Sequence, residues 1–94
     1  MDNTNILLTI RARDGIVYEG KVQSVTSVNE TGKFDILPEH ANFISLIKDT
    51  VVIKDIQGSM KKIKIDVGLL RTRQNKVEIY LGIDSSSTSR NSLL

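Results

Sequence analysis

The one histidine of this chain, His40, lies close to its one proline, Pro38, in the segment Leu37-Pro38-Glu39-His40-Ala41. An imidazole beside a carboxylate could activate a serine or threonine nucleophile. No nucleophile-elbow pattern accompanies His40, so a turn histidine with local hydrogen bonds is favoured over a catalytic one. The residues therefore predict no catalytic site, and the chain is not expected to be an enzyme.

The sequence also gives little support for a metal site or a nucleotide site. The chain has no cysteine, and its lone histidine leaves only scattered carboxylates such as Asp35, Glu39 and Asp84. Neither a GxGxxG nor a Walker pattern is present. We expect no metal and no cofactor.

A basic run, Lys61-Lys62-Ile63-Lys64, could contact phosphates. The formal charge of the chain is only +2, and it has two Phe, two Tyr and no Trp to stack on bases. Lysines on the solvent face of a strand more often protect a sheet edge. Nucleic acid is therefore not an expected partner.

The elements around these residues follow a period of two. Ile63, Ile65 and Val67 alternate with polar residues, and the segments from Ile6 to Arg13 and from Lys76 to Ile83 are similar. Such alternation predicts strands with one face on a core. No segment before residue 84 has a convincing helical period, and Phe43-Ile44-Ser45-Leu46-Ile47 fits a strand better than a helix.

Turn signals separate these strands at Asp14-Gly15, Glu30-Thr31-Gly32, Lys48-Asp49, Gln57-Gly58 and Gln74-Asn75. Proline cannot occupy a central strand, so Pro38 ends a short strand from Phe34 to Leu37, and a new one begins at Phe43. The spacing predicts an all-β fold, an antiparallel two-sheet sandwich (a small barrel being the other option) of about eight to ten short strands.

With 94 residues the chain is expected to be one domain, residues 1–84, followed by a flexible serine-rich tail, residues 85–94. The first residues lack the basic and apolar regions of a signal peptide, and no apolar run is long enough to span a membrane. An intracellular protein is expected, with the membrane reached only indirectly.

Four segments in order resemble one family. They are the hairpin ending in Tyr18-Glu19-Gly20, the strand Val22-Gln23-Ser24-Val25, the turn Gly32-Lys33-Phe34-Asp35-Ile36-Leu37-Pro38-Glu39-His40-Ala41, and Val67-Gly68-Leu69-Leu70 with the following Asn75-Lys76-Val77. From about Asn5 to Asp84 the chain resembles the N-terminal β-sandwich domain of the epsilon subunit of F-type ATP synthases, called delta in mitochondria. It departs from the family at Asp35 and Glu39, where glycine is usual, and at Asn42, where proline is usual.

The resemblance implies a non-catalytic subunit of the rotor, or central stalk. Such a subunit links the gamma subunit to the polar loops of the membrane c-ring, and it is peripheral on the energy-transducing membrane, on the cytoplasmic side in a bacterium or in the stroma or matrix of an organelle. By motif, Glu30, Lys33 and Asp35 would face the c-ring, and His40 and Ala41 the gamma subunit. Family members continue into a two-helix C-terminal domain, whereas no helical hairpin is expected in residues 85–94, so the resemblance implies neither an inhibitory arm nor a nucleotide site.

One alternative stays open at this point. A free-standing β-sandwich that binds or regulates another protein would have the same strand pattern, because a fold does not fix a function.

Overall fold

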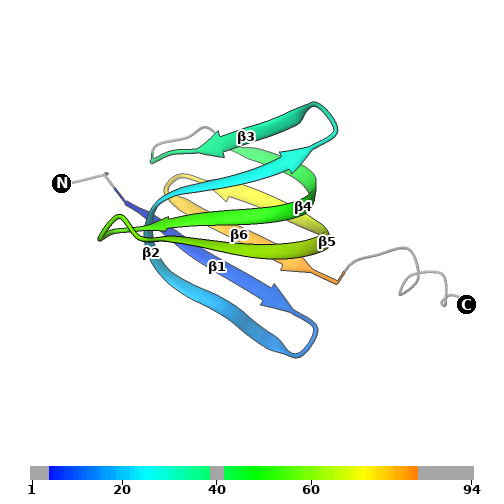
Figure 1. The fold of residues 1–94 in the computed structure, drawn as a ribbon, viewed down its shortest axis with the longest axis horizontal. Coiled ribbons are helices and arrows are strands. Elements are labelled where there is room, and N and C mark those ends of the chain that lie inside the picture. The colour runs from blue at the N-terminus through cyan, green and yellow to red at the C-terminus, as the bar shows by residue number, and fades with distance from the viewer. Residues whose placement is uncertain (1–4, 39–41, 83–94) are drawn as a thin grey trace, which may run out of the picture.

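In the computed structural model, residues 5–38 and 42–82 are described, and they form six β-strands without a helix (Figure 1). The strands are β1 (Ile6–Ala12), β2 (Gly15–Asn29), β3 (Gly32–Ile36), β4 (Phe43–Asp55), β5 (Met60–Arg73) and β6 (Lys76–Leu81). The all-β class predicted from the alternation is confirmed. These same residues contain no helix able to cross a membrane. The predicted tail, residues 85–94, lies outside them.

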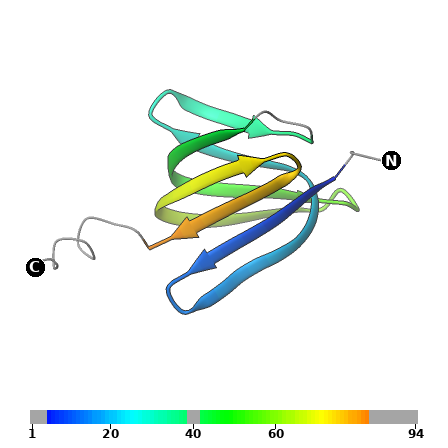
Figure 2. The ribbon, with the colours of Figure 1, turned by 180° about the vertical axis from the view of Figure 1, so that it is seen from behind.

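All six strands belong to one hydrogen-bonded sheet in the order β1-β6-β5-β4-β2-β3. A further pairing of β1 with β2 closes five of the strands into a ring, while β3 pairs only with β2 (Figures 1 and 2). One ladder differs from the predicted antiparallel arrangement. β1 runs parallel to β6, with Leu8 opposite Val77 and Ile10 opposite Ile79.

The prediction of about eight to ten short strands was wrong, because three long strands take the place of several short ones. β2, β4 and β5 contain 15, 13 and 14 residues. Register shifts interrupt their ladders without ending them, for example between Lys48 and Asp49 in the β4–β5 pair. Lys48-Asp49 is therefore a bulge inside β4 and not the predicted turn, and Asp49 has a φ of 72°.

These long strands change partners along their length. The first half of β2 pairs with β1, whereas its second half pairs with β4 and β3. β5 pairs with β6 only from Gly68 onward. Hydrogen bonding thus joins five strands into one closed, barrel-like sheet, which fits the small-barrel option better than the two separate sheets of the favoured prediction.

The core is entirely aliphatic and follows the alternation of the strands. Two aromatic rings, Phe34 of β3 and Phe43 of β4, pack edge-to-face beside it with centroids 5.7 Å apart. Burial of each core side chain contributes about 1.5–3 kcal/mol. Among the described residues, the fully buried hydrophobic side chains are Ile6, Leu8, Ile10, Val22, Val25, Ile36, Ile47, Val51, Ile53, Leu70, Val77 and Ile79.

Candidate functional site

The β2–β3 hairpin carries the three residues predicted to face the c-ring, and its turn is fixed by Asn29. The Oδ1 atom of Asn29 accepts hydrogen bonds from the backbone N–H of Thr31 (2.9 Å) and from its hydroxyl (2.7 Å). Such a side-chain turn suits asparagine, and Gly32, with a φ of 124°, allows the chain to enter β3. The turn therefore has a defined shape although it is exposed.

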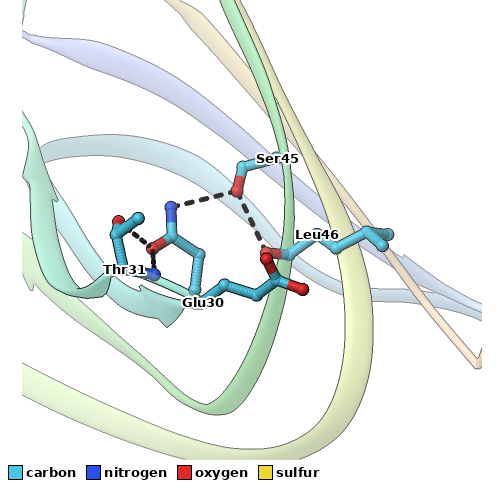
Figure 3. Close-up of a pocket in the computed structure, with 5 residues that line it drawn as sticks. Glu30, Thr31, Ser45 and Leu46 are labelled. Carbon is cyan, nitrogen blue, oxygen red and sulfur yellow. Dashed lines mark hydrogen bonds between the residues drawn. The ribbon is translucent and has the colours of Figure 1, made fainter.

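A second set of hydrogen bonds anchors this turn to β4. The Nδ2 of Asn29 donates to Ser45 Oγ (3.1 Å), which donates to the carbonyl oxygen of Leu46 (3.0 Å; Figure 3). Between turn and strand lies a shallow pocket of about 300 Å³, lined by Asn29, Glu30, Thr31, Ser45 and Leu46. The Leu46 side chain is 61% exposed, so the pocket combines polar groups with uncovered apolar surface.

The charged residues of the hairpin are exposed and lie close together. Glu30 is in the turn, and Lys33 and Asp35 alternate in β3 with the inward-facing Phe34 and Ile36. Asp35 accepts a hydrogen bond from the hydroxyl of Thr26, its partner across the ladder. The structure thus brings all three predicted residues onto one hairpin.

The other two predicted site residues, His40 and Ala41, lie outside the described residues. The chain is described again from Asn42, whose Oδ1 accepts a hydrogen bond from the backbone N–H of Gln74 at 3.3 Å. This bond ties the start of β4 to the β5–β6 turn.

The titratable groups of the described residues do not converge on a reaction centre. Within residues 5–38 and 42–82, no three His, Cys, Asp or Glu side chains lie close enough to share a metal ion. The ion pair of this region joins Arg71 of β5 to Glu78 of β6 at 2.6 Å. The hydrogen bond from Arg71 lowers the pKa of Glu78 below its ordinary value, and the same contact raises the pKa of Arg71. Within these residues the charged side chains are therefore spread over the surface, and His40, the one imidazole of the chain, lies outside them.

Sequence reasoning missed the contribution of β4 to this site. Ile44 is 66% exposed and, like Leu46, lies on the face of β4 away from the core. The signal was available, because Phe43-Ile44-Ser45-Leu46-Ile47 has apolar residues on both faces of a strand, whereas a solvated face would be polar.

Comparison with known proteins gives a family for this fold. Residues 5–81 match the family model of the ATP synthase delta/epsilon chain, beta-sandwich domain. The ATP synthase epsilon chain of Nitratiruptor sp. is 34% identical over 70 residues, which cover 73% of this chain and 54% of the relative. The epsilon chain of Campylobacter fetus is 33% identical over 77 residues, covering 81% and 60%. The chain thus spans roughly half to three fifths of the length of these relatives.

Solved structures agree on the fold. A chain of the Euglena gracilis mitochondrial ATP synthase superposes with a TM-score of 0.78 at 16% identity, covering 93% of this chain and 61% of the other. A chain from the Tetrahymena thermophila mitochondrial ATP synthase central stalk and c-ring gives a TM-score of 0.68 at 10% identity, covering 100% and 77%. With the closed sheet, the β2–β3 hairpin and the match over residues 5–81 taken together, the chain belongs to the ATP synthase delta/epsilon family by its β-sandwich domain.

Proposed function

We propose that this chain is a subunit of the central stalk of an F-type ATP synthase, where it links the gamma subunit to the c-ring. The observation that carries the proposal is the family match over residues 5–81, nearly all of the described chain. The names of its relatives support it, since they are ATP synthase epsilon chains. In this role the chain is part of an enzyme complex, makes and breaks no bond itself, and lies peripherally on the energy-transducing membrane.

Within this role, the β2–β3 hairpin contacts the polar loops of the c-ring through Glu30, Lys33 and Asp35. Two features support the assignment: the three side chains are exposed, and the turn that presents them is anchored to β4 by Asn29. A preorganised surface loses little conformational entropy on docking. His40 and Ala41 are proposed to contact the gamma subunit, on the family motif alone.

The mechanical part of the proposal concerns stiffness. We propose that the sheet is folded into two packed layers, as in a β-sandwich. Each of the long strands β2, β4 and β5 would contribute one half to each layer. Support comes from the change of partners along these strands and from the aliphatic core. A close-packed interior deforms little under load, which suits a subunit that transmits torque.

Co-purification of the full chain with gamma and c subunits tests the proposal. The wild-type chain is expected to bring down both partners. Glu30→Lys is expected to reduce recovery of the c-ring several-fold without changing the thermal midpoint, because the side chain of Glu30 is exposed in the turn. The matched control is Asp14→Lys, which makes the same charge change in the β1–β2 turn, away from the β2–β3 hairpin (Figure 1).

Two results would count against the proposal at different levels. Equal loss of the c-ring in Asp14→Lys and Glu30→Lys would refute the assignment of the hairpin but keep the stalk role. Failure of the wild-type chain to co-purify with either partner would refute the stalk role and favour a free-standing binding module.

A further inference from the structure

The first half of β5 has a neighbour on one side only. Residues Met60 to Val67 pair with β4, and pairing with β6 begins at Gly68. In an antiparallel pair, alternate backbone N–H and C=O groups point away from the partner strand. No other strand of the described residues takes up these groups, so this stretch of β5 is an open sheet edge.

Basic and apolar side chains alternate along this edge. Lys62 and Lys64 are exposed on the outer face. Ile63 and Ile65 are half-buried on the inner face and pack against the core at its rim. A strand added here would cover these two isoleucines and lie beside the two lysines.

The edge carries three lysines, Lys61, Lys62 and Lys64, against one carboxylate, Asp66, which lies on the outer face with Lys62 and Lys64. No carboxylate of the described residues forms an ion pair with Lys61, Lys62 or Lys64, since the described ion pair is Arg71–Glu78. The Lys61 ammonium lies 5.8 Å from the centroid of the Tyr18 ring, a cation–π contact. Lysine side chains therefore lie next to the unpaired backbone N–H and C=O groups of this edge.

The charges of this edge also indicate what kind of strand could pair with it. A second copy paired antiparallel about Ile63 would set Lys62 of each chain opposite Lys64 of the other, and like charges on adjacent strands are destabilising. Acidic side chains at alternate positions of an added strand would face Lys62 and Lys64, while apolar residues between them would cover Ile63 and Ile65.

We propose that the β5 edge from Met60 to Asp66 binds an extended segment of a partner protein by strand addition, and that this segment alternates acidic and apolar residues. Main-chain hydrogen bonds would supply the affinity and the lysines the specificity. This surface is distinct from the β2–β3 hairpin, and the inference does not depend on the stalk role.

The test uses the full chain and a fluorescein-labelled, end-blocked peptide of alternating glutamate and valine, titrated by anisotropy at low ionic strength. Binding is expected, with slowed amide exchange confined to residues 60–66. Lys62→Glu/Lys64→Glu should weaken binding about tenfold or more, since two attractive cross-strand pairs become repulsive. The matched control is Arg73→Glu/Lys76→Glu, with the same charge change on exposed residues that flank the β5–β6 turn, which should bind like the wild type.

A second probe separates strand addition from simple charge attraction. The same peptide with N-methyl groups on alternate amides keeps its charge but cannot complete a ladder, so it should lose binding. Equal binding of the methylated and unmethylated peptides would overturn the proposal. So would failure of the peptide to bind while vesicles containing anionic lipid bind and lose binding in Lys62→Glu/Lys64→Glu, because the edge would then be a membrane-binding surface.

Discussion

Gly68 occupies a point where three strands leave no room for a side chain. A Cβ atom there would lie 3.1 Å from a methyl carbon of Leu81, 3.2 Å from the carbonyl oxygen of Tyr80 and 3.4 Å from a side-chain carbon of Ile47. The backbone oxygen is held in the ladder and cannot move aside as a side chain can. Gly68→Ala is therefore expected to lower the free energy of unfolding by about 1–3 kcal/mol, measured by urea denaturation.

Gly20 provides the matched control for this substitution. It also lies within a strand, but the nearest atoms to an added Cβ would be 3.9 Å away, in the ring and hydroxyl of Tyr18. Gly20→Ala is expected to be neutral or slightly stabilising, because alanine restricts the unfolded chain. A loss in Gly20→Ala as large as in Gly68→Ala would show that strand propensity, and not crowding, decides the result.

Between elements, the Arg71–Glu78 pair joins the second half of β5 to β6 and makes stability depend on pH. Because the pKa of Glu78 is lower in the folded state than its ordinary value of 4.5, the pair stabilises the fold fully above that value. Its contribution falls as the pH drops below 4.5 and is gone once the pH is below the folded-state pKa. The difference in denaturation midpoint between the wild type and Glu78→Gln should therefore shrink on acidification. A difference that stays constant from pH 7 to below the folded-state pKa would contradict this linkage.

The β2–β3 hairpin depends on one side chain, Asn29, for both its shape and its anchor. Asn29→Ala removes the acceptor for Thr31 and the donor to Ser45, and is expected to cost about 1–2 kcal/mol in thermal or urea denaturation. Asn29→Asp keeps the acceptor and loses the donor, so its stability should lie between that of the wild type and of Asn29→Ala. If Asn29→Asp were as unstable as Asn29→Ala, the anchor to Ser45 would be the dominant contribution.

The alternation of apolar and polar residues predicted which segments form strands. The segments around Ile6, Phe43, Ile63 and Val77 are all strands, because a period of two with β-branched residues specifies which face is buried. It does not specify which strand lies alongside. The parallel pairing of β1 with β6 therefore could not be deduced, nor could the passage of β4 through Lys48-Asp49 as a bulge, since the same residues also favour a turn.

The sequence could predict only those parts of the candidate site whose residues are close together in the chain. Glu30, Lys33 and Asp35 are near in sequence, so a hairpin necessarily gathers them. Ser45 and Leu46 reach the same pocket from a strand that follows β3 across residues 37–42, and only the folded chain brings them to Asn29.

At the scale of the whole molecule, the binding regions proposed here are separate. The β2–β3 hairpin and the open edge of β5 lie on opposite sides of the stretch of β4 that pairs with both β2 and β5. One surface presents a rigid turn with mixed charges, and the other an incomplete sheet with lysines. Occupation of one therefore leaves the other accessible, and a single small domain can contact two partners at once.

The parallel ladder between β1 and β6 also affects how the protein is made. Residues Leu7 to Arg11 are synthesised well before their neighbours Lys76 to Tyr80, with β2 to β5 between them in the sequence. Until then Leu8 and Ile10 lack the strand that shields them, so the nascent polypeptide must leave the ribosome with part of its interior uncovered. The β1–β6 ladder should therefore form only after β6 has been synthesised, with a period before that in which chaperones can bind the growing chain.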